Sequence, residues 1–138
     1  MSKLFDVNFT LLQKSMDFRT KRNTMLSSNV ANLETPGYKA KDLVFEEALG
    51  KAMHAQLPGP LTVTNSKHLD GSRALPLDMV RPELIQTATP DAALDGNTVN
   101  LETEMAKLAE NQVAYQAYTQ MISLKFQALK TAIREGIQ

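Results

Sequence analysis

The sequence predicts an all-α dominated fold, in which two long terminal helices pair as an antiparallel, coiled-coil-like hairpin around a short, poorly ordered or small-β middle segment. Apolar residues recur at alternating steps of four and three near both ends of the chain, which is the pattern of a helix seam. Prolines and glycines gather between the two ends. The 138 residues therefore predict a single elongated unit, 1–138, with parts at 6–34 (N-terminal helix), 35–56 (turn and short helix), 57–99 (loop or short strands) and 100–135 (C-terminal helix).

The N-terminal helix is predicted from an apolar row that Arg19 and Asn23 interrupt. The row consists of Phe5, Phe9, Leu12, Met16, Leu26, Val30 and Leu33. Leu11, Phe18 and Met25 form a second row, seven residues apart, which widens the apolar face. This width predicts contacts with more than one neighbour, with an ordinary amphipathic helix of generous face as the alternative.

A tight turn at Thr35-Pro36-Gly37-Tyr38 is predicted to end this helix. The proline disfavours a helical conformation in the residue before it, and the glycine supplies the positive φ that a type II turn needs at its third residue. Residues 41–51 are then expected to form a short helix.

The middle of the chain, residues 57–96, holds five of the six prolines and three of the six glycines. Apolar residues are sparse there, so this segment has little surface to bury. We expect it to be poorly ordered or to form short strands, at 61–64 and 84–87, where β-branched and apolar residues are bounded by turn residues.

The C-terminal helix is predicted from an N-cap at Asn100 to about Arg134, because no Gly or Pro interrupts this stretch. Its apolar row consists of Leu101, Met105, Leu108, Tyr115, Ile122, Phe126, Leu129 and Ile133. Residues 111–124 carry no charge at all. A helix face without charge is typical of the centre of an interface, with an exposed amide-rich surface as the alternative.

Aligning the two rows as a hairpin places Phe9 level with Phe126. Asn23 then falls beside Gln112, and Arg19 and Thr119 lie within a turn of that layer. This polar layer would fix the register, because slipping either helix would set polar groups against hydrocarbon. A chance match between two such rows is the alternative.

The residues that enzyme sites need are scarce in this sequence. His54 and His68 lie fourteen residues apart, which is no metal-ligand spacing, and both are expected at the surface. The chain has no cysteine, no Gly-rich phosphate loop and no nucleophile-elbow serine. Fifteen basic and fifteen acidic residues cancel, so no net field favours nucleic acid or a membrane surface. We therefore expect no enzyme, cofactor, metal, nucleic acid or membrane insertion.

Two motifs resemble the family of flagellar rod, hook and hook-associated proteins. The first is 27–32 (SSNVAN) and 35–40 (TPGYKA) with Asp42 and Phe45, and its turn residues are Asn29, Asn32, Thr35, Pro36, Gly37 and Tyr38. The second, 95–105 (DGNTVNLETEM) with 108–112 (LAENQ) and Tyr115, closely resembles the proximal-rod members. Together they cover about half of the chain, at the two ends.

This resemblance implies a structural subunit of the proximal rod of the flagellar basal body, the drive shaft that joins the MS ring to the distal rod. The two apolar rows, from Phe9 to Leu33 and from Leu101 to Ile133, are then the expected hairpin and assembly interface. The implied partners are copies of the chain, other rod subunits, the MS ring with its FliE-type adaptor and the flagellar type III export apparatus. The resemblance also implies export to the periplasmic rod without a cleaved signal, which agrees with the lack of an apolar run of signal-peptide length near the N-terminus.

The resemblance also implies an export signal at Phe45 and Leu49, because early rod and hook substrates share a Phe followed four residues later by an apolar residue. Phe5 with Phe9 fits the same form. A cytoplasmic helical-hairpin adaptor or export chaperone, binding partner helices along the same stripes, is the alternative function.

Overall fold

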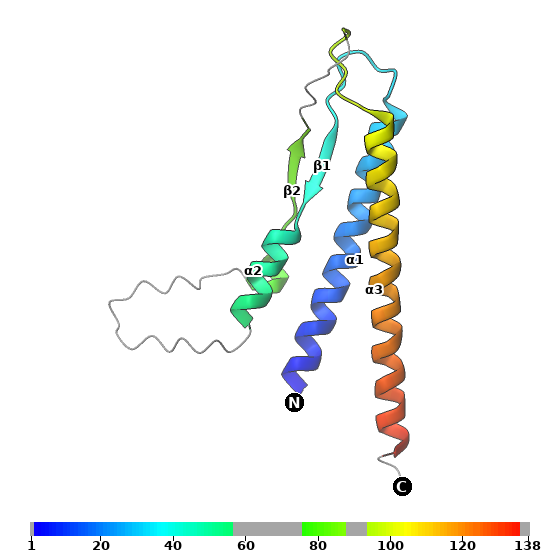
Figure 1. The fold of residues 1–138 in the computed structure, drawn as a ribbon. Helices are drawn as coiled ribbons and strands as arrows, with labels where there is room; N and C mark the ends of the chain where they lie inside the picture. The colour runs from blue at the N-terminus through cyan, green and yellow to red at the C-terminus, as the bar shows by residue number, and fades with distance from the viewer. Residues whose placement is uncertain (1, 57–75, 88–93, 136–138) are drawn as a thin grey trace, which may run out of the picture.

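The computed structural model describes residues 2–56, 76–87 and 94–135 (Figure 1). In chain order their elements are α1 (Ser2–Ala31), β1 (Lys41–Val44), α2 (Glu46–Gln56), the 3₁₀ turn η1 (Leu77–Met79), β2 (Glu83–Gln86) and α3 (Leu101–Glu135). The prediction of a mostly helical chain with two long terminal helices is confirmed, and the small β segment is a two-stranded sheet.

Helices α1 and α3 lie side by side and run in opposite directions, and α3 extends past the beginning of α1 (Figure 1). The rings of Phe9 and Phe126 meet edge to face, with their centroids 5.7 Å apart. Towards the other end of the pair, Asn29 Nδ2 donates to Glu104 Oε2 over 2.8 Å. The coiled-coil-like character of this arrangement stays a prediction.

The start of α3 is capped as the sequence predicts. Asn100 Oδ1 accepts a hydrogen bond from Thr103 N–H over 3.0 Å, which satisfies one of the amides that a helix leaves unpaired at its N-terminus. Glu102 and Glu104 lie in the first turn and Arg134 in the last, the charge order that the helix dipole favours.

Strands β1 and β2 form an antiparallel pair in which Leu43 lies opposite Leu84. The helix predicted over 41–51 is therefore wrong for its first residues, and α2 begins only at Glu46. Contacts with the rest of the chain outweigh the local pattern here, because Leu43 is buried in the core and its neighbour Asp42 binds an arginine of α1.

The strand predicted at 84–87 is confirmed as β2, which begins and ends one residue earlier. His54 is exposed, as expected. The strand predicted at 61–64 and the second histidine, His68, lie outside the described residues.

A small hydrophobic core lies between α1 and the unit that β1, α2 and η1 form. Its buried members are Phe18, Leu43, Phe45, Leu49, Ala52, Leu77 and Val80. Leu11 and Met25 of α1 pack against its edge. The second row of α1 therefore faces this core while Phe9 faces α3, which confirms the prediction that α1 has more than one neighbour.

Candidate assembly interface

The predicted interface residues fall into three groups by exposure. Leu12 and Leu26 are buried, and Leu26 has no exposed surface. The half-buried members are Met16, Val30, Leu33, Leu108, Tyr115 and Ile122. The exposed members are Phe9, Leu101, Met105, Phe126, Leu129 and Ile133. The helix pair thus covers part of each row and leaves apolar side chains, most of them on α3, open to further contacts.

A buried polar layer joins α1 to α3 at Arg19 and Asn111. Asn111 Nδ2 donates to Arg19 O over 2.9 Å, and Asn111 Oδ1 accepts from Arg19 Nη1 over 3.4 Å. Arg19, predicted within a turn of the polar layer, belongs to the observed one. The central pair predicted for that layer, Asn23 and Gln112, is wrong, because both of these side chains are exposed. Adjacent residues on a helix point in different directions. The side chain of Asn111 therefore faces α1, whereas that of its neighbour Gln112 faces solvent.

Asn29 forms the centre of a second buried polar layer. Its amide nitrogen donates to Lys41 O over 2.7 Å and to Glu104 Oε2 over 2.8 Å. Its amide oxygen accepts from Lys41 N–H over 3.0 Å and from the Tyr38 hydroxyl over 3.3 Å. The amide thus pairs with the backbone of β1 much as a neighbouring strand would. One side chain joins α1, the turn, β1 and α3.

The turn after α1 has the predicted geometry. Tyr38 N–H donates to Thr35 O over 3.2 Å, and Gly37 has a φ of 71°, both of which agree with a type II turn. Gly37 N–H donates across to Asp95 O over 3.0 Å. The turn is thereby fastened to the segment that leads into α3.

Asn97, in that same segment, binds the turn that follows α1. Its Nδ2 lies 3.0, 2.7 and 3.0 Å from the carbonyl oxygens of Asn32, Leu33 and Thr35. These three carbonyls lie just beyond the end of α1 at Ala31, so the amide holds the turn that follows α1 against the segment that leads into α3. The turn at 35–38 and the start of the second motif at 95–97 are therefore hydrogen-bonded to each other.

A network of ion pairs lies beside the Asn29 layer. Arg22 binds Asp42 through two hydrogen bonds, Nε to Oδ1 over 2.8 Å and Nη2 to Oδ2 over 3.1 Å. Lys107 Nζ of α3 lies 3.3 Å from Asp42 Oδ2 and 3.2 Å from Glu104 Oε1. Asp42 therefore connects β1 to both terminal helices.

The network determines the protonation of Asp42. Burial would by itself raise the pKa of this carboxyl group, but the hydrogen bonds from Arg22 and from Leu43 N–H, with the charges of Arg22 and Lys107, hold the pKa below its ordinary value of 3.8. Burial would also lower the pKa of Arg22, yet Asp42 keeps it raised. Both groups stay charged at neutral pH.

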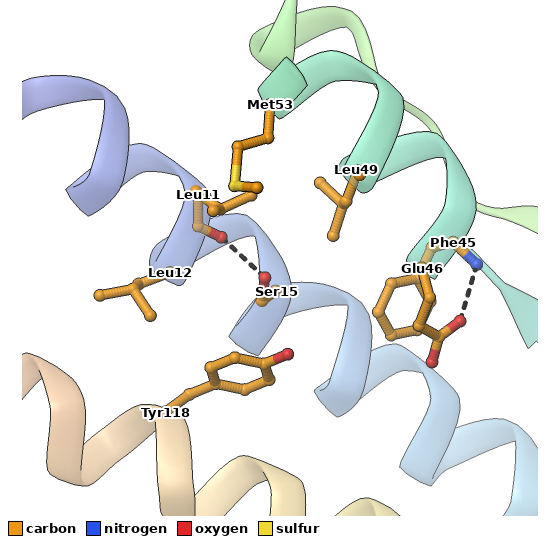
Figure 2. Close-up of a pocket in the computed structure, with 9 residues that line it drawn as sticks. Leu11, Leu12, Ser15, Phe45, Glu46, Leu49, Met53 and Tyr118 are labelled. Atoms are coloured by element: carbon orange, nitrogen blue, oxygen red, sulfur yellow. Dashed lines mark hydrogen bonds between the residues drawn. The ribbon is translucent and has the colours of Figure 1, made fainter. Parts of the chain in front are cut away.

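A pocket of about 200 Å³ opens between the three helices (Figure 2). Leu11 and Leu12 of α1, Leu49 and Met53 of α2 and Tyr118 of α3 are among its lining residues. Most of these side chains present hydrocarbon to it, so the pocket is suited to an apolar group.

Within residues 2–56, 76–87 and 94–135, none of the helices has the length and apolar character needed to cross a membrane. In these same ranges, no group of three or more His, Asp or Glu side chains is placed to hold a metal ion.

Curated relatives match the chain along almost its full length, although no protein-family model matches it. The flagellar basal body rod protein FlgB of Aeromonas hydrophila is 37% identical over 137 residues, which span 97% of this chain and 98% of the relative. The chain belongs to the FlgB family. The FlgB proteins of Proteus mirabilis and Escherichia coli are 30% and 29% identical, over 93% and 95% of this chain and 94% and 96% of their own lengths.

The resemblance to flagellar rod proteins is thereby confirmed, and the FlgB match covers both helices, the turn and the polar layers. Sequence reasoning missed Glu104 and Asn111 as buried partners of α1. The sequence pattern could have indicated them. Glu104, Asn111 and Tyr118 are seven residues apart, so they form a row on α3 that lies beside its apolar row.

Proposed function

We propose that this chain is a structural subunit of the proximal rod of the bacterial flagellar basal body, in the drive shaft that joins the MS ring to the distal rod. The observation that carries the proposal is the match to FlgB proteins, 37% identical in the case of Aeromonas hydrophila, along nearly the whole of both chains. The role is structural, and we assign no residue to catalysis.

The helix pair supports a polymerising role. In this proposal α1 and α3 form a coiled-coil-like hairpin, and apolar residues that they leave exposed, such as Met105 and Ile133, meet neighbouring subunits. Residues 111–124 carry no charged side chain, so a neighbouring subunit covers the exposed part of this stretch without desolvating a charge. Covered apolar surface contributes about 25 cal/mol per Å² before the costs of ordering. Contacts that repeat without closing produce a helical tube.

The proposed partners are copies of this chain, other rod subunits, the MS ring with its FliE-type adaptor and the type III export apparatus. Phe45 and Leu49, the proposed export signal, are buried in the core. An export receptor therefore reads them before the chain folds, in keeping with delivery to the periplasm as an unfolded chain without a cleaved signal.

Fractionation of a flagellated strain, with the tagged chain replacing its own FlgB protein, tests this function. We expect the tag in the periplasmic fraction after osmotic shock and in purified basal bodies, with restored swimming. A cytoplasmic enzyme serves as the leakage control. Recovery of the tag only in the cytoplasm, with basal bodies that lack it, would contradict a rod subunit and favour the hairpin adaptor or export chaperone.

A further inference from the structure

Methionine is the sulfur-containing residue of this chain, which has seven methionines and no cysteine. A methionine thioether takes up one oxygen atom reversibly and then becomes a polar sulfoxide, a change that disrupts apolar contacts made by the side chain. The oxidant has to reach the sulfur atom, so the exposed methionines are the ones on which this reaction acts.

The described methionines differ in exposure. Three of them are half-buried: Met16, Met25 and Met53. Met105 and Met121 of α3 are 53% and 51% exposed, and Met79 of η1 is 59% exposed. Two of the three exposed thioethers therefore lie on the helix that the fold covers least.

Both methionines of α3 lie among apolar side chains that the fold leaves open. Met121 belongs to the stretch 111–124, which carries no charge, and lies three residues before Leu124, which is 60% exposed. Met105 lies four residues after Leu101, which is 43% exposed. Residues three or four apart are neighbours on the surface of a helix. Each thioether is thus part of an exposed apolar patch.

Oxidation changes the polarity of these patches. A sulfur lone pair attacks one oxygen of hydrogen peroxide, so that an S–O bond forms while the O–O bond breaks. The departing hydroxide takes the proton of the transferred hydroxyl group and becomes water. The sulfur is oxidised by two electrons and the peroxide is reduced by two. In the free chain the sulfoxide stays in water, whereas beneath a neighbouring subunit it would be a buried dipole among hydrocarbon groups.

We propose that Met105 and Met121 are oxidation sites at which a peroxide blocks incorporation of this chain into the rod. The proposal rests on the rod function above and adds a chemical state of the subunit to it. In the reduced state the thioethers pack against neighbouring subunits, and in the sulfoxide state they weaken those contacts. A covered thioether is out of reach of the oxidant, so the reaction acts on subunits before they assemble.

Competition between two tagged copies in one strain tests the proposal. One copy is the wild-type chain, and the other carries Met105→Leu with Met121→Leu, which keeps the apolar volume and removes the sulfur. Without peroxide, we expect both tags in purified basal bodies in about equal amounts. When the copies are induced under mild hydrogen peroxide, the ratio of wild-type to variant tag is expected to fall at least fivefold, because buried sulfoxides weaken the contacts of the wild-type chain.

Met79→Leu is the matched control, because Met79 is about as exposed as the methionines of α3 but lies in η1. A strain that carries the wild-type chain and this variant should keep equal tags with and without peroxide. An unchanged ratio for the α3 variant under peroxide, or an equal shift for Met79→Leu, would overturn the proposal. Absence of both tags from basal bodies without peroxide would instead overturn the rod function itself.

Glutamine substitutions give a second readout that needs no oxidant. Met105→Gln with Met121→Gln places a polar group at both sites and is expected to lower incorporation at least fivefold, while circular dichroism of the isolated chain stays unchanged. Met79→Gln should be incorporated as the wild type is. Peptide mass spectrometry of the peroxide-treated isolated chain should find Met105 and Met121 oxidised faster than the half-buried Met53. Normal incorporation of the α3 glutamine variant, or equal oxidation of all three methionines, would contradict the assignment.

Discussion

Asn29 places one amide group where four parts of the chain meet. Asn29→Ala would leave the Lys41 backbone groups and a Glu104 carboxylate oxygen buried without these partners. Each such group costs about 1–3 kcal/mol, so we expect the free energy of unfolding to fall by at least that much in urea titrations at pH 7. Asn23→Ala, at an exposed position of the same helix, is the control and should change it by less than about 0.5 kcal/mol. Equal stability of the two variants would contradict the role given to Asn29.

Leu26 shows how unevenly the apolar rows are used. It has no exposed surface, whereas Leu124 on α3 is 60% exposed. We expect Leu26→Ala to lower the free energy of unfolding by about 2–5 kcal/mol, because it removes buried hydrocarbon and leaves a cavity. Leu124→Ala removes the same atoms from the surface and should have little effect on the isolated chain. A similar loss in both would mean that Leu26 is not a core residue.

At the scale of elements, Asp42 holds β1 against α1 and α3, and its charge makes this connection depend on pH. Its folded-state pKa lies below the ordinary 3.8, so its contribution to stability is complete above about pH 5 and is lost as the pH falls through the folded-state value. We expect the free energy of unfolding to decrease over that acidic range. Asp42→Asn should be less stable at pH 7, with the difference from wild type shrinking towards pH 3.

Urea titrations from pH 7 to pH 3 measure this difference. Glu47, whose pKa is lowered by its hydrogen bond with Lys51, is exposed, so Glu47→Gln is the matched control and should keep the wild-type pH dependence. A constant gap between Asp42→Asn and wild type over the whole range would show that the Asp42 charge does not couple β1 to the helices.

The helices could be predicted from the sequence, because a seam repeated over 30 residues or more and an N-cap such as Asn100 are local signals. The strand at β1 could not, because its pairing with β2 joins segments about 40 residues apart. The polar layer could be predicted only in part, for a different reason. Spacing placed an amide near the α1–α3 contact, but whether Asn111 or Gln112 turns inward depends on the rotation of α3, which no local pattern records.

Phe45 and Leu49 belong to the core and are also the proposed export signal, so an experiment on the signal needs a control for the loss of core packing. We expect Phe45→Ala with Leu49→Ala to reduce secretion of the chain by the export apparatus at least several-fold. Phe18→Ala is the matched control, because the Phe18 ring lies 5.3 Å from that of Phe45 in the same core but outside the signal. Equal secretion defects in the two would indicate that folding, and not the signal, limits export.

At the scale of the whole molecule, α1 is the element that the other elements pack against, so the chain is held together with only a small hydrophobic core. One side of α1 contacts α3 and the other covers the core built by β1 and α2. The outward side of α3, in contrast, is left without a partner in the described chain, and its exposed apolar residues include Val113, Met121 and Leu124. Apolar surface arranged in this way is typical of a subunit that completes its packing in an assembly.

The outer face of α3 should therefore tolerate charge in the monomer and reject it in the rod. Val113 and Leu124 lie eleven residues apart on one helix face and are 66% and 60% exposed. We expect Val113→Glu with Leu124→Glu to change the free energy of unfolding by less than about 1 kcal/mol, because both positions are in water. In the rod, two uncompensated carboxylates would be buried against a neighbour, at a cost of several kcal/mol, so assembly and swimming should be lost.

The matched control carries the same two substitutions, with the same spacing, on exposed positions of α1, as Gln13→Glu with Thr24→Glu. Purified basal bodies and swimming in soft agar report assembly, and circular dichroism confirms that both variants keep their helices. If the α3 variant swims as well as wild type, the charge-free face is a solvated surface and not an interface. If both pairs abolish swimming while the monomers stay folded, neighbours cover α1 as well, and each subunit is enclosed on two sides in the rod.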